Sequence, residues 1–363
     1  MATYSVILTS IEGSRIKVLD QFIALTYTLT INQMGTLQID VPKLAPRFLS
    51  VDNRLEIWRQ VPGGKKYLEG DTCWFIRDWE EYLTQQGQEY IRIIAYSTNF
   101  ILDAPVIAYK STTSQASKSD QADDMIKAIA RENIESSAAD SDRDLSGYIT
   151  IDADTSDGPS IDKSFSYRNM LATMREIAQA SDYQGTPLFF GLTYDPNSQD
   201  FTFATRTQQW GVDRSQANRV VLSARNGTLS DVRRSYLSSE ERTVAYIGGR
   251  GQGEDRTVTE VEDSERSNLS PFNRREVFVN ASNSDDDQLT GIGQAALKNY
   301  RPVEIFSARF RDTQAVQYGR EIKFGDRCIA EHNGRSVSVR LDSVRVRVER
   351  GREDIGVELR ADE

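Results

Sequence analysis

A side-chain period of two marks the end of the chain. Apolar residues alternate with polar or charged ones through residues 336–341 and again through 344–349. This period predicts β-strands with one buried and one exposed face, because successive side chains of a strand point to opposite sides. The exposed face is predicted to carry Arg340, Arg345, Arg347 and Glu349. A charged face of this kind indicates contact with a neighbouring subunit or with a water-filled channel.

Short strands are also predicted throughout residues 1–100. Residues 25–31 alternate strictly, and Gly35 separates them from residues 37–41, a pattern typical of a hairpin that ends at Pro42. Further strands are predicted at 55–58, 73–79 and 90–96. Six or seven short strands at this spacing predict a small antiparallel barrel or sandwich.

Three segments have the period of an amphipathic helix. The first is predicted to start at Ser119 or Asp120, after a polar, linker-like tract at 111–117, and the second after Ser166. The third is predicted at 285–300, with aspartates in its first turn, and Pro302 ends it. Strands predicted outside these helices lie at 188–194, 201–204, 220–222, 243–247, 257–261 and from 303 onward.

These elements predict a mainly β chain with an α+β insertion. Residues 1–110 form a first β-domain, residues 111–215 a small helix-containing module, and residues 216–363 a second β-domain with one helix. A chain of 363 residues exceeds what one hydrophobic core usually spans, which supports two or three domains.

Composition excludes several functional classes. No run of about 18 apolar residues is present, so a membrane-spanning helix is not expected. The N-terminus has the pattern of a first strand and not of a signal peptide, so signal-dependent export is not expected. The formal net charge of -10 argues against a protein that binds nucleic acid by neutralising phosphates.

Two segments have partial binding motifs. The glycine-rich run 248–253 is followed by acidic and extended sequence, without the lysine and helix of a nucleotide site, which favours a turn between strands. Residues 152–158 are similar to a calcium loop, but the glycine is one position late and Lys163 replaces the final glutamate. An acidic surface turn is the favoured interpretation, with an incidental cation site as the alternative.

Residues 158–164 end like a phosphate-binding loop, but Asp162 stands where the second glycine is required. His332 is the single histidine and precedes an Asn-Gly turn, while Cys73 and Cys328 are predicted to be buried thiols. The short basic clusters 233–234 and 273–275 are expected to form ion pairs between strands or subunits. Nothing singles out a catalytic pair among the acids, so no catalytic, cofactor or metal residue is assigned, and an enzyme is not predicted.

Several stretches together resemble the baseplate or tail-tip hub proteins of long-tailed, siphovirus-type bacteriophages. The resemblance runs through most of the chain in order and spacing, on residues 15–42, 210–215, 220–229 and 318–327. It implies two tail-tube-like β-domains per chain, similar to the central hub of contractile tails. It further implies a homotrimer, a ring with pseudo-sixfold symmetry that lies at the virion tail tip and is made in the host cytoplasm.

The implied partners are the distal tail protein, the tail tube, the tape-measure protein and a tip or fibre protein. DNA would pass through the ring without specific binding, and the acidic net charge suggests walls that repel phosphates. The alternatives are the hub of a contractile injection system or gene-transfer particle, a carbohydrate-binding or hydrolytic tail protein, and an ordinary α+β enzyme. The sequence leaves open the host, the receptor and the residues that face the channel.

Overall fold

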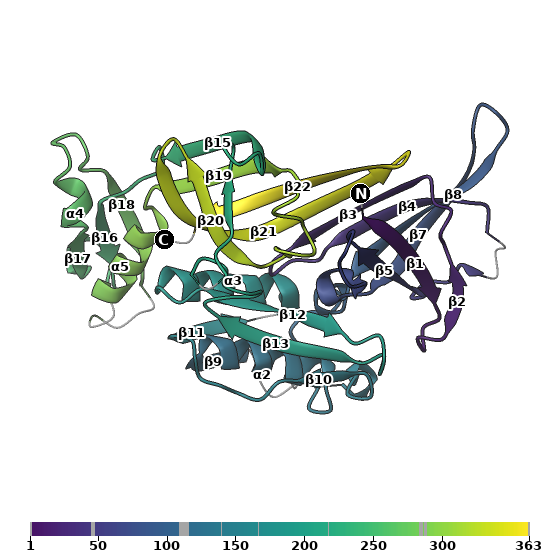
Figure 1. Cartoon of the computed structure of the whole chain (residues 1–363). Helices are drawn as coiled ribbons and strands as arrows, with labels where there is room; N and C mark the ends of the chain where they lie inside the picture. Colours follow the sequence, from purple (N-terminus) through teal and green to yellow (C-terminus); the bar gives the residue numbers. More distant parts are fainter. Residues whose placement is uncertain are drawn as a thin grey trace. The chain divides into compact units, whose positions relative to one another are not determined.

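The computed structural model describes residues 2–44, 48–108, 116–138, 140–165, 167–216, 218–282, 286 and 289–361. The chain forms two compact units. The larger contains residues 1–182, 186–232 and 307–363, and the smaller contains 183–185 and 233–306. These units do not coincide with the three predicted segments, because strands from the first and third segments pair in one sheet. Figure 1 shows the elements along the chain.

A 14-stranded sheet organises the larger unit. Its N-terminal half follows the predicted alternation, since Leu25, Tyr27 and Leu29 are buried while the residues between them are partly exposed. These strands are β1 (Thr3–Thr9), β2 (Arg15–Val18), β3 (Ala24–Thr30), β4 (Thr36–Pro42), β5 (Arg54–Gln60), β6 (Tyr67–Leu68), β7 (Trp74–Leu83) and β8 (Glu89–Ser97). The short helices η2 (Glu69–Asp71) and α1 (Phe100–Asp103) follow β6 and β8.

The C-terminal half of the same sheet is built from strands far away in sequence. They are β14 (Val221–Ser223), β15 (Leu229–Leu237), β19 (Val303–Phe310), β20 (Arg327–His332), β21 (Arg335–Glu349) and β22 (Arg352–Ala361). β21 pairs with β22 from Val339 to Glu349 and with β3 from Ser343 to Glu349, antiparallel in both cases. Figure 1 shows this pairing as yellow strands running beside purple ones. One hydrogen-bonded sheet thus joins the two ends of the chain.

A helix-containing module is inserted between these halves, as predicted. Strand β9 (Ala116–Gln121) pairs with β11 (Ser160–Phe165), and β10 (Ile149–Ile151) joins the hairpin of β12 (Leu188–Tyr194) and β13 (Phe201–Thr207). The helices are α2 (Ala122–Ile134), α3 (Met170–Tyr183) and the short η3 (Ser141–Arg143).

Two predicted helix starts are wrong by a few residues. Ser119 and Asp120 lie in β9 and do not cap α2, whose N-cap is Gln121; strand pairing with β11 outweighs their capping preference. Tyr167 is exposed with φ +47°, outside the helical region, and α3 begins after Asn169, whose Oδ1 accepts a hydrogen bond from Ala172 N at 2.8 Å. Ser166 and residues 111–115 of the predicted linker lie outside the described residues.

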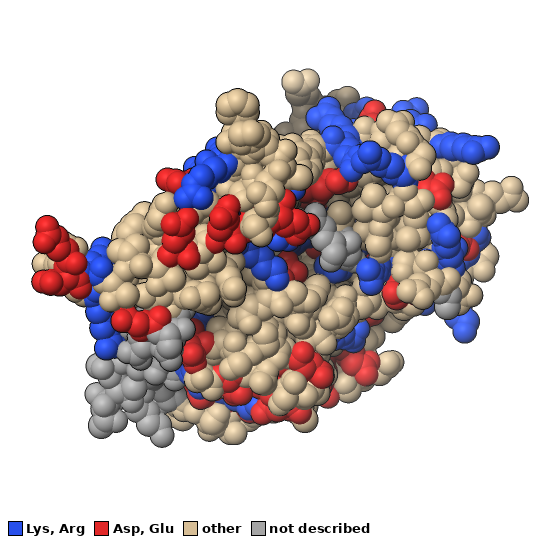
Figure 2. Space-filling model, turned by 90° about the vertical axis from the view of Figure 1, so that its left-hand side faces the viewer, with Lys and Arg blue, Asp and Glu red and all other residues tan. Residues whose placement is uncertain are grey.

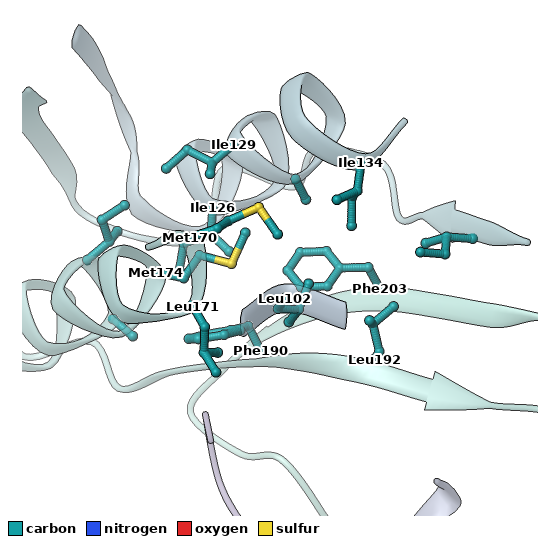
Figure 3. Close-up of a cluster of buried hydrophobic side chains, with 14 of the residues drawn as sticks. Leu102, Ile126, Ile129, Ile134, Met170, Leu171, Met174, Phe190, Leu192 and Phe203 are labelled. Carbon is teal, nitrogen blue, oxygen red and sulfur yellow. The ribbon is translucent and has the colours of Figure 1, made fainter. Parts of the chain in front are cut away.

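The module has a core that it shares with the N-terminal half of the sheet. Met170 and Met174 of α3 point toward Ile126 of α2, and Phe190 and Phe203 of the hairpin lie beneath them (Figure 3). All five side chains are at most 1% exposed, and burying each contributes on the order of 1.5–3 kcal/mol. Leu102, Phe75 and Cys73, from the N-terminal half of the chain's large sheet and the helix after it, belong to the same cluster. These contacts fix the module on β7 and α1.

The smaller unit is a three-stranded sheet with one face covered by a helix. Its elements are β16 (Val244–Gly248), β17 (Val258–Glu262), β18 (Glu276–Asn280), η4 (Gly253–Asp255), α4 (Ser264–Ser267) and α5 (Leu289–Asn299). Ala245 and Ile247 of β16 pack against Leu289 and Leu297 of α5. The third predicted helix is thus present, and Asp285 and Asp287 of its predicted first turn lie outside the described residues.

The prediction of a mainly β chain with antiparallel sheets and an α+β insertion is confirmed. Among the strand pairs described for this structure, three depart from that prediction by being parallel: β10 with β13, β14 with β20, and β16 with β18.

Candidate assembly site

A buried arginine lies where the N-terminal and C-terminal segments of the larger unit meet. Arg59 of β5 is 0% exposed and lies on a buried face of the sheet. Its Nε donates to Tyr4 Oη at 2.9 Å and its Nη2 to Glu353 Oε1 at 2.8 Å. Its Nη1 donates to Tyr67 Oη at 3.0 Å and to the carbonyl oxygen of Tyr318 at 2.5 Å. One side chain therefore connects β1, β6, β22 and the loop before β20.

A second carboxylate completes this group, the Arg59 cluster. Glu69 is 1% exposed and accepts hydrogen bonds from Tyr67 Oη at 3.0 Å and from Tyr318 Oη at 2.6 Å. Burial raises the pKa of Glu69, although the charge of Arg59 opposes this effect. Burial also acts to raise the pKa of Glu353, but the charge of Arg59 and hydrogen bonds from Tyr4, Arg59 and the Ala2 amide lower it below its usual value.

The Arg59 cluster is suited to holding separate segments of the chain together. The polar groups of the cluster are hydrogen-bonded to one another, and burial raises the pKa of Tyr4 and of Tyr67 well above the usual tyrosine value. Gly319 follows the bound carbonyl with φ +92°, and a Cβ at this position would lie 2.2 Å from Tyr67 Oη. The loop thus passes so closely that only glycine fits.

A cavity of about 330 Å³ adjoins the cluster. It lies between the turn after β3, residues 67–72, the hairpin strand β12 and residues 323–326. Its polar walls are bonded within the chain: Asn32 donates to Leu188 O at 2.9 Å, and Asp326 accepts from Val212 N and Arg214 Nε, both at 2.8 Å. These hydrogen bonds hold the module against the sheet.

The terminal strands place three of the four predicted site residues on an outer face. Val344, Val346 and Val348 are buried, and Arg345 and Arg347 between them are exposed. Arg347 Nη2 bonds Glu349 Oε2 at 2.5 Å and lies opposite Asp354 of β22 and Thr26 of β3. The predicted alternation is confirmed here, while contact of this face with a subunit or a channel stays a prediction.

Arg340 departs from the prediction. Its side chain is 3% exposed, and its guanidinium group lies 4.1 Å from the ring centre of Phe189 on β12. The module's hairpin covers the sheet at this point, so Arg340 packs inside the chain as a cation–π partner. It does not lie on the outer face with Arg345 and Arg347.

The charged outer face continues across strands of the N-terminal half. Asp40 of β4 pairs with Arg92 of β8, whose Nε is 2.9 Å from Asp40 Oδ1. On the face seen in Figure 2, both acidic and basic side chains are visible, with a group of basic side chains at the upper right. The predicted ion pairs of the short basic clusters are confirmed by Arg234 with Glu304 and Arg274 with Glu260.

The partial binding motifs are used inside the chain. The run 248–253 joins β16 to β17, as predicted, and Arg256 Nη2 donates to Gly248 O at 2.9 Å. Residues 153–158 are held by the side chains of α2, and Lys163 pairs with Glu176 at 2.6 Å. His332 precedes a turn with φ +51° at Asn333 and +75° at Gly334, which confirms the predicted hairpin. Cys73 and Cys328 are both buried, as predicted.

Within the described part of the chain, no group of three or more His, Cys, Asp and Glu residues could hold a metal ion. None of the described helices is long and apolar enough to cross a membrane.

Sequence reasoning missed the Arg59 cluster, although a signal was present. Leu55, Ile57 and Arg59 share one face of β5, so an alternating pattern places the arginine at a core position. A charged residue on a buried face must find partners, since burying an unpaired charge is costly. The partners themselves, Glu353 above all, lie too far away in sequence to be deduced.

Comparison with known proteins identifies the family. The family model described as "Siphovirus ReqiPepy6 Gp37-like protein" matches residues 7–360. No curated protein matches the sequence significantly.

Solved structures of phage tail proteins share the fold. The 43 kDa tail protein of prophage MuSo2 from Shewanella oneidensis aligns with a TM-score of 0.60 at 10% identity, covering 98% of this chain and 97% of its own. A tail protein from Neisseria meningitidis MC58 gives 0.58 at 10% identity, with 99% and 97% covered. The prophage tail protein gp18 from Listeria monocytogenes EGD-e gives 0.54 at 10% identity, with 99% and 94% covered. The chain belongs to the Siphovirus ReqiPepy6 Gp37-like family of phage tail proteins.

Proposed function

We propose that this chain is the structural hub of a phage tail tip, a homotrimer that joins the tail tube to the tip. The observation that carries the proposal is the pairing of β21 with β3. It joins two β-blocks of one chain, the N-terminal half and the C-terminal half of the large sheet, into a single sheet. A chain with two such blocks can present six similar units from three copies, and closed cyclic symmetry is the usual outcome for homo-oligomers.

The two blocks lie within the segments 1–110 and 216–363, with 111–215 as the module that braces them. The proposed neighbours are the distal tail protein and tail tube on one side, a tip or fibre protein on the other, and the end of the tape-measure protein. The protein then resides in the virion, and its role is structural and not enzymatic.

The outer face with Arg345, Arg347 and Glu349 is the proposed wall of the channel or contact between copies. Its charges are mixed, because Arg347 pairs with Glu349 and lies opposite Asp354. In place of the acidic wall suggested by the net charge, we propose a wall of mixed charges. Such a wall offers DNA phosphates few free cations, so DNA slides without lasting contacts.

Native mass spectrometry of the purified chain tests the assembly. A trimer of 3 × 41.0 = 123 kDa is the expected result. Tail-tip particles that contain the chain should then show three copies in one ring. A chain that stays monomeric alone and in the presence of tail tube, or a ring with another number of copies, contradicts the proposal.

Charge reversal distinguishes the two roles of the outer face. If Arg345 and Arg347 lie at a subunit contact, the double variant Arg345→Glu/Arg347→Glu should dissociate the trimer. If they lie on the channel wall, the trimer of this variant should persist while DNA release from assembled particles changes. Arg335→Glu, at an exposed position at the start of β21, is the matched control. An unchanged mass together with unchanged DNA release removes both roles.

A further inference from the structure

Lys127 of α2 is a buried ammonium group inside the module. Its side chain is 1% exposed. Its Nζ lies 2.9 Å from the carbonyl oxygen of Ala153, 3.1 Å from Thr155 Oγ1, 3.3 Å from Asp124 Oδ1 and 3.5 Å from Asp123 Oδ2. Four oxygen atoms from two segments of chain thus surround one positive charge. We call this arrangement the Lys127 cage.

The two carboxylates of the cage also hold the loop that resembles a calcium loop. Asp123 Oδ1 accepts from Gly158 N at 2.9 Å, and its Oδ2 accepts from Thr155 Oγ1 at 2.8 Å. Asp124 accepts from Thr155 N at 3.0 Å, Ser156 N at 3.3 Å and Ser156 Oγ at 2.7 Å. Burial acts to raise the pKa of Asp124, but the hydrogen bonds from Ser156 and Thr155, with a further one from Lys127, lower it to about 2.

The donor set of the cage is the kind that hard cations use. Carboxylate, carbonyl and hydroxyl oxygens are the ligands of Ca²⁺ in proteins. Two buried carboxylates side by side repel each other and need a positive charge between them. The ammonium of Lys127 is an independent observation that a cation belongs at this position, because the side chain is 1% exposed and its Nζ forms four hydrogen bonds to oxygen atoms.

We propose that Lys127 supplies the resident cation of this site, so that its ammonium group does the work of a bound metal ion. A covalently attached cation cannot dissociate, and the loop 153–158 therefore stays fixed on α2 at any ion concentration. Shortening Lys127 should uncover the oxygen cage and turn it into a site for Ca²⁺. The inference concerns the module alone and does not depend on the proposed hub function.

Thermal unfolding of the full chain in EDTA and in CaCl₂ tests this inference. Wild-type protein should unfold at the same temperature in both. Lys127→Ala should unfold at a lower temperature in EDTA and recover by at least roughly 4 °C in CaCl₂, since a ligand that binds only the folded state stabilises it. Titration with Tb³⁺, a luminescent substitute for Ca²⁺, should show one saturable site in Lys127→Ala and none in the wild type.

Two control variants make the test specific. Lys127→Ala/Asp124→Asn keeps the space but lacks one carboxylate, so it should lose the response to Ca²⁺. Lys163→Ala removes a more exposed lysine of the same module, paired with Glu176, and should not create a response. The inference is overturned if Lys127→Ala gains no more from Ca²⁺ than these controls, including the case in which it is unfolded in both solutions. Destabilisation of the wild type by EDTA also overturns it, because a metal ion would then be present already.

Discussion

Replacing Arg59 by methionine should destabilise the larger unit by about 3–5 kcal/mol. Methionine fills most of the volume of the arginine stem, so the loss comes from electrostatics and hydrogen bonds and not from a cavity. The change leaves the carboxylate of Glu353, 7% exposed, without its cation. It also removes hydrogen bonds to Tyr4, Tyr67 and the carbonyl of Tyr318.

The magnitude follows from what remains buried. Breaking a buried ion pair by removing one partner costs more than the pair contributes, because the other charge is left uncompensated. Each neutral group left without a partner adds about 1–3 kcal/mol if water cannot reach it. Protonation of Glu353 limits the total, since a neutral acid tolerates burial better than a charged one.

Urea unfolding of the full chain measures this effect in a double-mutant cycle. Arg59→Met, Glu353→Gln and the double variant should show a coupling free energy above about 1 kcal/mol, because the two residues share one interaction. Arg309→Met is the matched control, as Arg309 and Asp231 are 62% and 69% exposed and lie 3.8 Å apart. Such an exposed pair contributes about 0–1 kcal/mol.

Two results would refute the reasoning. A free energy of unfolding of Arg59→Met within about 1 kcal/mol of the wild-type value would show that the buried charges are not mutually dependent. Alternatively, the cycle could close with additive effects, and Arg59 would then act through packing alone.

Three further changes probe other parts of the fold. The difference in the free energy of unfolding between wild type and Asp124→Asn should be largest above the ordinary Asp pKa of 3.8 and should shrink as pH falls toward about 2. The reason is that the folded state holds Asp124 in its ionised form. Urea unfolding across this pH range measures the difference. Gly319→Ala should lower the unfolding temperature by several degrees, since the φ of Gly319 is +92° and a Cβ there would clash with Tyr67. Gly87→Ala is the control: its φ is +77°, but a Cβ there meets open space, so the unfolding temperature should fall less. Deletion of Asp342 should abolish cooperative unfolding monitored by circular dichroism, while Asp342→Ala, which keeps the chain length, should retain it.

Strands and turns could be predicted because their signals are local. The alternation at 25–31 and the Asn-Gly dipeptide at 333–334 each correspond to an observed strand or turn. Strand β9 was missed because a polar run such as 116–121 has no apolar period, and only its pairing with β11 makes it a strand. Tertiary contacts decided that element, and a single sequence does not contain them in readable form.

The site was predicted less well than the fold, for a related reason. Arg345, Arg347 and Glu349 were placed on an outer face by alternation alone, and the structure puts them there. Arg340 obeys the same alternation but is buried, because Phe189 from a distant hairpin covers it. Period two tells which residues share a face of a strand, but not whether another element covers that face.

Strand β21 contains one signal that explains how the two β-blocks join. Its apolar positions are odd at Val339 and Leu341 and even at Val344 and Val346, so a straight strand would expose one set. The register with β22 shifts between Leu341 and Ser343, where Asp342 is the extra residue of a β-bulge. The bulge returns both sets to the buried side, and all four residues are 0% exposed. Before the bulge β21 pairs with β20, and after it with β3. A change of phase within one alternating run therefore indicates a strand that serves two β-blocks, and this shared strand is why a domain boundary cannot separate the ends of the chain.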